Sequence, residues 1–228
     1  DAELHVYRAA ELGHVIRHGV FYPRWAPNLY LGYGYPIFNY YAPFTYYLSN
    51  AFALVLPGLE IVSGVKAVFV LGLVLAAIGA YLLGRVLFDP GAGILAAAAF
   101  TFSPYILFID PHARGDLAEH FAFCLIPLTF YFLHELLWSP NRRMLLGTVL
   151  CLATIVFSHN LAGLVTSVLM LAYWAWAVLV GGRRRHALWG PVAFALAAAI
   201  IAFFWVPALL ESDSVQLPLI GPGQFAFG

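Results

Sequence analysis

Long apolar runs recur along this chain and constrain its fold more than any other feature. A helix needs about 20 apolar residues to cross roughly 30 Å of hydrocarbon at about 1.5 Å per residue. Runs of this kind follow one another with short polar breaks between them. The predicted spans are residues 61–87, 92–109, 117–138, 144–158, 161–180 and 187–210. The sequence therefore predicts an all-α, polytopic transmembrane helix bundle of about six spans.

The composition supports a membrane protein and excludes a nucleic-acid-binding one. Of the 228 residues, 63% are hydrophobic and only 10% are charged, whereas about 25% are charged in a typical soluble domain. The 11 basic residues are balanced by 11 acidic ones, and Lys66 is the sole lysine, so there is no basic surface to hold a phosphate backbone. Cys124 and Cys151 lie in apolar runs, where a thiol usually acts as a small hydrophobe. The lipid bilayer is the expected partner.

Polar and turn-forming residues mark the ends of the predicted spans. The triplet Ser158-His159-Asn160 divides the apolar stretch 144–180 into two. The other predicted breaks are Asp89-Pro90-Gly91, Asp110-Pro111, Ser139-Pro140-Asn141 and Gly181-Gly182. We expect one membrane domain with a first loop at 1–60, a bundle at 61–210 and a tail at 211–228. Because the chain starts without Met and ends in a Gly/Pro-rich stretch, we interpret it as a piece of a longer protein.

The distribution of arginine predicts how the bundle sits in the membrane. Basic residues in short connections favour the cytoplasmic side. Arg85, the pair Arg142 and Arg143, and the triplet 183–185 fall in alternate connections, while the other connections hold only Arg114. We therefore expect an extracytoplasmic face formed by residues 1–60, the loop 110–116, the turn 158–160 and the tail after Glu211.

The first 60 residues differ from the rest of the chain. Residues 2–18 have the apolar spacing of a helix that lies along the membrane surface, and residues 42–57 predict a short interfacial or re-entrant helix. Between them, the stretch 21–47 is rich in aromatic residues, glycine and proline. Aromatic residues of this kind anchor proteins at the lipid–water boundary, and stacking against a sugar is the alternative interpretation.

Two carboxylates, Asp1 and Glu3, open this predicted extracytoplasmic segment. Two acids one residue apart can share a divalent cation, or one can act as a base while the other orients it. The alternative is an ordinary helix start, since acidic residues are favourable at a helix N-terminus.

A second group of polar residues surrounds the start of the span at 117–138. The group is His112, Arg114, Asp116, Glu119 and His120. The spacing of Asp116 and Glu119 is that of a capping box, with Asp116 capping the helix and Glu119 reaching back. Capping does not explain His112 and Arg114, and a guanidinium suits an anionic phosphate group. His159 is either a hydrogen-bonding residue of a membrane turn or part of the same site.

Several motifs together resemble known membrane proteins. The acidic pair of the first loop, with His5, Arg8 and a long aromatic loop, resembles the GT-C superfamily of integral-membrane glycosyltransferases. Further motifs are similar to bacterial membrane proteins labelled pyruvoyl-tetrahydropterin-synthase-related, a label that implies no pterin chemistry here. These motifs are Tyr22-Pro23-Arg24-Trp25-Ala26-Pro27, Gly32-Tyr33-Gly34-Tyr35-Pro36, Tyr40-Tyr41-Ala42-Pro43, Arg114-Gly115-Asp116-Leu117-Ala118-Glu119 and Ser158-His159-Asn160.

The resemblance implies transfer of a sugar from a polyprenyl-phosphate donor to a glycan, lipid or protein acceptor outside a bacterial plasma membrane. It gives the base role to Asp1, with Glu3 second, and a divalent cation such as Mg²⁺ or Mn²⁺ could bind this pair. The substrate-binding residues it implies are His5, Arg8, His112, Arg114, Glu119, His159 and Asn160. We expect Asp1, Glu3, Arg114 and His159 to border one cavity.

Two other functions stay open on the sequence alone. A transporter or flippase for lipid-linked glycans would carry polar groups through the full membrane depth and paired broken helices in two related halves. A non-catalytic scaffold subunit of the cell envelope would leave its polar groups scattered and unconnected.

Overall fold

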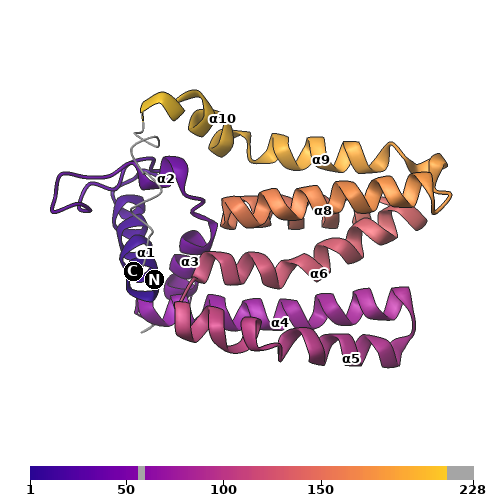
Figure 1. The fold of residues 1–228 in the computed structure, drawn as a ribbon. Coiled ribbons are helices and arrows are strands. Elements are labelled where there is room, and N and C mark those ends of the chain that lie inside the picture. The colour runs from indigo at the N-terminus through magenta and orange to yellow at the C-terminus, as the bar shows by residue number, and fades with distance from the viewer. Residues whose placement is uncertain (56–59, 215–228) are drawn as a thin grey trace, which may run out of the picture.

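A computed structural model describes residues 1–55 and 60–214, and within these ranges the protein is helical without strands. The bundle is formed by α4 (Ile61–Leu87), α5 (Pro90–Thr101), the π-helix η1 (Tyr105–Arg114), α6 (Leu117–Trp138), α7 (Arg142–Ser158), α8 (Asn160–Leu179) and α9 (Trp189–Ile200). One end of it carries α1 (Ala2–Arg17), α2 (Ile37–Tyr40), α3 (Phe44–Val55) and α10 (Ala202–Leu210) (Figure 1). Two short 3₁₀-helices, η2 (Arg184–His186) and η3 (Ser212–Ser214), complete the described chain. The predicted helix at 42–57 and tail at 211–228 extend beyond these ranges, so their ends lie outside the described residues.

The helix α4 packs between α5 and α6, so the packing order differs from the sequence order. The central helix α6 contacts α4 on one side and α7 on the other, while α5 packs against α4, and α8 and α9 pack against α7. At the α4–α6 crossing, a Cβ on Gly79 would lie 2.5 Å from the backbone nitrogen of Leu128. Only glycine fits this approach, which is the small-residue packing expected between helices in a membrane.

Four helical stretches are long and apolar enough to cross a membrane. They are Ile61–Leu87, Pro90–Arg114, Leu117–Trp138 and Asn160–Leu179. A fifth results if the bent pair Arg184–Ile200 and Ala202–Leu210 is one span. The helix α7 has 17 residues, or about 25 Å of rise, and a sixth span at α7 stays a prediction. The structure thus confirms an all-α protein with several apolar helices.

One predicted boundary is wrong, and one predicted span is bent. Asp110-Pro111 does not end a span, because both residues lie inside η1, which continues to Arg114. A π-helix has i→i+5 hydrogen bonds and wider turns than an α-helix. The helix therefore continues past Pro111, although a proline at this place in the sequence predicts a helix end. The predicted span 187–210 is bent by 73°. At this bend the indole N–H of Trp205 donates to the carbonyl oxygen of Ala198 at 2.8 Å. The last carbonyl groups of a helix lack helical N–H partners, and this hydrogen bond supplies one at the end of α9.

The bundle has two ends of different character, which we call the site end and the arginine end. The site end comprises the η1–α6 junction, the α7–α8 turn and the covering helices α1–α3, and the arginine end comprises the connections after α4, α6 and α8 (Figure 1). At the site end, the backbone nitrogen of Asp1 lies 3.0 Å from the carbonyl oxygen of Arg114. The side chain of Asn160 donates to the carbonyl oxygen of Tyr40 at 2.7 Å. The segments predicted to share one face therefore lie together.

Candidate polar site at the end of the bundle

Arg114, the last residue of η1, is the centre of a charged cluster. One guanidinium nitrogen lies 3.2 Å from Asp110 Oδ1 and 2.7 Å from Glu119 Oε1. The other lies 3.1 Å from Glu119 Oε2 and 3.6 Å from Asp116 Oδ2. The hydroxyl of Tyr105 accepts from Arg114 and donates to Glu119. One guanidinium is therefore surrounded by three carboxylates.

The turn between η1 and α6 brings these groups together. Gly115 has a φ of +66°, in the left-handed region that glycine adopts without strain. A Cβ at this position would lie 2.5 Å from the Cβ of Ala2, so glycine also allows α1 to approach. Asp116 then caps α6, because its Oδ1 accepts from the backbone nitrogen of Glu119 at 3.0 Å. The predicted capping role of Asp116 is confirmed.

The second half of the predicted capping box is wrong. The carboxylate of Glu119 does not reach back to Asp116 but binds Arg114 through both oxygens. The backbone nitrogen of Asp116 donates instead to the carbonyl oxygen of Asp110 at 3.2 Å. A bidentate pair with a guanidinium is stronger than a hydrogen bond to a neutral backbone N–H, which explains why Glu119 turns to Arg114.

His5 of α1 connects the cluster to α3. Its side chain is buried, with Nε2 3.4 Å from Asp116 Oδ1 and Nδ1 2.8 Å from the hydroxyl of Tyr46. Burial acts to raise the pKa of Asp116, but the hydrogen bonds from His5 and from the Glu119 backbone hold that pKa well below its usual range. Asp116 is therefore a carboxylate at neutral pH.

Arg8 lies one helical turn from His5 and contacts two tyrosines. It donates to the hydroxyl of Tyr46 at 3.4 Å, and its guanidinium carbon lies 4.4 Å from the centre of the Tyr41 ring. Burial raises the pKa of Tyr46 to about 12 and that of Tyr41 further. Both phenols are neutral and can act as hydrogen-bond donors at this site.

His159 comes from the turn between α7 and α8. Its Nδ1 accepts from the backbone nitrogen of Ala162 at 3.2 Å, which caps α8. Burial lowers the pKa of His159, although Asp116 and Glu119 act to raise it. A nitrogen of His159 and one oxygen each of Asp116 and Glu119 lie within 4.8 Å of one another. Two segments of the chain, the start of α6 and the α7–α8 turn, thus converge on one position.

An open depression borders the cluster. It has a volume of about 420 Å³ and is lined by Asp1, Glu3, His112 and Arg114, with Ala2, Leu4, Ala113 and Gly115 between them. Asp1, Glu3 and His112 are exposed. Of the four residues expected to border one cavity, three line this depression. His159 is not among its lining residues and joins the cluster through Asp116 and Glu119.

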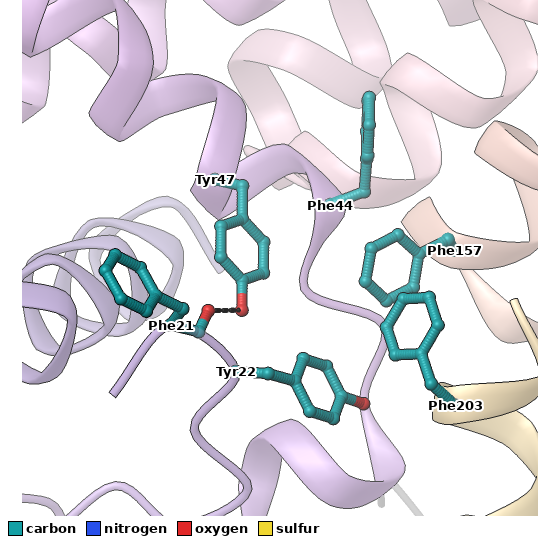
Figure 2. Close-up of a pocket in the computed structure, with 6 residues that line it drawn as sticks. All are labelled: Phe21, Tyr22, Phe44, Tyr47, Phe157 and Phe203. Atoms are coloured by element: carbon teal, nitrogen blue, oxygen red, sulfur yellow. Dashed lines mark hydrogen bonds between the residues drawn. The ribbon is translucent and has the colours of Figure 1, made fainter. Parts of the chain in front are cut away.

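A second hollow, which we call the aromatic groove, is formed by six aromatic side chains and has a volume of about 560 Å³ (Figure 2). The hydroxyl of Tyr47 donates to the carbonyl oxygen of Phe21 at 2.8 Å, and the rings of Tyr22 and Phe203 meet edge to face with centroids 5.0 Å apart. Its lining residues are Phe21, Tyr22, Phe44, Tyr47, Phe157 and Phe203. Sugar stacking by the aromatic loop stays a prediction.

Sequence reasoning missed Asp110, Tyr105 and Tyr46. Asp110 was assigned to a turn, yet its side chain is fully buried and its Oδ2 has no hydrogen-bond partner within the described part of the chain. The spacing of Asp110 and Arg114 is i and i+4, which places two residues on one helical face and was the available signal. No pattern in the sequence points to the two tyrosines.

Metal-ligating side chains converge at a different position from the one predicted. In the part of the chain that the structure describes, the group of three or more such residues with converging ligand atoms is Asp116, Glu119 and His159. Asp1 and Glu3 do not belong to it, and a cation at that pair stays a prediction.

Comparison with known proteins identifies the family. The profile of a family described as a 6-pyruvoyl-tetrahydropterin synthase related domain, membrane protein, matches residues 38–216, well over half of the chain. The chain belongs to this family. The match confirms the resemblance to the pyruvoyl-tetrahydropterin-synthase-related proteins and the membrane class, and the GT-C resemblance stays a prediction. It includes Arg114, Asp116, Glu119 and His159, whereas the α1 residues precede it. No curated protein and no solved structure matches the chain.

Proposed function

We propose that the protein is a membrane glycosyltransferase that moves a sugar from a polyprenyl-phosphate donor to an acceptor at the extracytoplasmic face of the plasma membrane. The observation that carries the proposal is the depression in which exposed carboxylates of Asp1 and Glu3 face the guanidinium-bearing segment at Arg114. The resemblance of the first loop to the GT-C superfamily supports the same assignment, and the arginines at the opposite end support the orientation.

The residues of the depression match what glycosyl transfer requires. An acceptor hydroxyl attacks the anomeric carbon, the new C–O bond forms, and the bond from that carbon to the donor phosphate breaks. The hydroxyl proton passes to a carboxylate, which must come within about 3 Å of it. Asp1 takes this role, with Glu3 beside it. Negative charge develops on the departing phosphate, and Arg114 and His112 lie where they can stabilise it.

The aromatic groove supports a lipid-linked donor. Its lining residues come from the first loop, α3, α7 and α10 and offer an almost wholly apolar surface at the site end (Figure 2). An isoprenoid chain is apolar, so burying it against such a surface is favourable at about 25 cal/mol per Å². The groove therefore provides a place for the carrier chain while the phosphate is held by polar groups of the site end.

The competing functions have less support. Within the described residues the four arginine–carboxylate ion pairs lie at the site end, so they do not mark a polar path through the bundle as a transporter would need. One bent helix pair is found there rather than two in related halves. The polar groups are also not scattered, since Arg114 joins three carboxylates, and this favours a site over a scaffold.

The test is sugar transfer by the natural protein purified into liposomes with a panel of polyprenyl-phosphate hexoses and pentoses. Release of sugar from the lipid fraction gives a readout that does not require a known acceptor. We expect Asp1→Asn to reduce the rate by about 100-fold or more, the size of a lost general base, and Glu3→Gln to reduce it less.

Glu60→Gln is the matched control, because Glu60 is an exposed acid that precedes α4 at the site end and does not line the depression. This variant should retain the wild-type rate. Undiminished transfer by Asp1→Asn, with a thermal unfolding curve like that of the wild type, would remove the proposed mechanism.

A further inference from the structure

The site end holds more negative than positive charge. Asp110, Asp116 and Glu119 all lie within 4 Å of Arg114. Within the described residues, no other arginine or lysine pairs with these carboxylates. The side chain of Asp110 is fully buried, and those of Asp116 and Glu119 are 11% and 14% exposed. Carboxylates removed from water in this way need a compensating cation. Two further positive charges would balance the three carboxylates.

A buried acceptor atom is left over beside Arg114. Asp110 Oδ1 accepts from the guanidinium nitrogen that also binds Glu119, so this carboxylate faces the cluster. Its Oδ2 is buried and has no hydrogen-bond partner within the described residues. Buried polar atoms are nearly always satisfied, and an unsatisfied one often marks a missing water or ion.

Three other side chains at the site end have the geometry of a metal site. Oxygens of Asp116 and Glu119 and a nitrogen of His159 lie within 4.8 Å of one another. Ligands at about 2.0–2.2 Å from one ion have mutual distances below this limit. We propose that Asp116, Glu119 and His159 bind a divalent transition-metal ion of the Zn²⁺ or Mn²⁺ type.

The ligand types distinguish this ion from other divalent cations. Mg²⁺ and Ca²⁺ prefer oxygen ligands, whereas an imidazole favours Zn²⁺ and other transition metals. The side chain of Arg114 is 38% exposed and can move toward the depression, which leaves the Glu119 carboxylate free for the ion.

The proposed ion site does not depend on sugar transfer. It uses residues other than Asp1 and Glu3, and its readout is the stoichiometry and affinity of metal binding. A protein that binds the ion but transfers no sugar would contradict only the proposed function, and the reverse result would contradict only the ion site.

The experiment uses the purified natural protein in detergent, stripped with a chelator and then dialysed against micromolar Zn²⁺ or Mn²⁺. Bound metal is measured by elemental analysis and affinity by calorimetry. The decisive variant is His159→Asn, because asparagine is a favourable N-cap and can replace the cap that His159 gives α8. We expect one ion per wild-type chain and an affinity reduced at least about 10-fold in His159→Asn.

His14→Asn tests the rival site. His14 and His18 stack with ring centroids 4.4 Å apart on exposed positions of α1 and could hold zinc themselves. This variant should bind like the wild type, and Glu119→Gln should bind like His159→Asn. Unfolding curves of the metal-free variants show whether they are folded. Wild-type affinity in folded His159→Asn, loss of binding in His14→Asn, or Mg²⁺ bound as tightly as Mn²⁺ would each overturn the proposal.

Discussion

Both ends of the bundle carry charged side chains but hold them differently. The four arginine–carboxylate ion pairs in the described residues all lie at the site end, as does the contact between His5 and Asp116. The basic side chains of the arginine end are mostly exposed, and none has an acidic partner within the described chain. The exposed ones are Arg85, Arg142, Arg143, Arg184 and Arg185. A high density of charged residues is therefore not enough to form a polar site. The two ends differ in how many chain segments meet around each charged side chain.

A matched pair of contacts shows the same difference. At the site end, Nδ1 of His5 lies 2.8 Å from the hydroxyl of Tyr46. Toward the arginine end, Nδ1 of His134 lies 2.6 Å from the hydroxyl of Tyr173. The ring of His134 then stacks on Trp138 at a centroid distance of 4.1 Å, whereas His5 extends the network to Asp116. The His134–Tyr173 pair therefore ends in aromatic packing, whereas the His5–Tyr46 pair belongs to the charged cluster around Arg114.

Replacing the central arginine should have the largest effect on stability. Arg114→Met leaves the carboxylates of Asp110 and Glu119 without their cation, and we expect the free energy of unfolding to fall by about 3 kcal/mol. This lies at the low end for a buried pair because Arg114 is partly exposed. The measurement is chemical or thermal unfolding in detergent.

Arg184→Met is the control at the arginine end. Arg184 is exposed and should change the free energy of unfolding by less than about 0.5 kcal/mol. Equal losses in both variants would mean that the two ends do not differ as described.

Removing one hydroxyl from each matched pair should give smaller effects. Tyr46→Phe leaves His5 buried without a partner for Nδ1, and we expect a loss of about 2 kcal/mol in the free energy of unfolding. Tyr173→Phe should cost about 1 kcal/mol or less, since Tyr173 is only half-buried and water can replace the hydroxyl. A larger loss in Tyr173→Phe than in Tyr46→Phe would reverse the comparison.

The exposed ion pair between Arg24 and Glu211 should have the smallest effect, and it should depend on pH. The hydrogen bond from Arg24 lowers the pKa of Glu211, and Asn39 also donates to this carboxylate at 3.1 Å. A carboxyl group whose pKa falls on folding stabilises the protein above its unfolded pKa, about 4.3 for glutamate, and loses this contribution as the pH falls through the folded value.

Hydrogen exchange of residues 36–41, compared between the wild type and Glu211→Gln at each pH, measures the pair. We expect the wild type to be better protected at pH 7, and the two proteins to converge only as the pH falls below the ordinary pKa of glutamate and through its lowered value in the folded protein. A difference that persists at low pH would show that the contact does not depend on the charge of Glu211.

Several helices could be predicted residue by residue because their limits are set locally. The predicted spans 61–87 and 117–138 coincide with α4 and α6, and the break at 158–160 separates α7 from α8. The length of an apolar run and the capping residues beside it decide these limits. The bend between α9 and α10 was missed because both sides of it are equally apolar.

The candidate site was predicted less completely than the helices. Arg114 and Glu119 could be singled out because charged groups next to apolar spans are costly and therefore few. Asp110 was missed because proline follows it and proline normally ends a helix. The orientation of the Glu119 side chain was missed because the capping box describes contacts within one helix, whereas Glu119 binds Arg114 of the preceding helix η1.

The sequence by itself determined that this is a helical membrane protein and where most of its helices begin and end, since apolar length and capping are properties of neighbouring residues. The tertiary structure alone decided which polar groups meet. Asp1 and Arg114 are 113 positions apart, and His159 reaches Asp116 and Glu119 from another turn. The energy of each contact depends on the distance between its atoms, and that distance is set by how the helices pack.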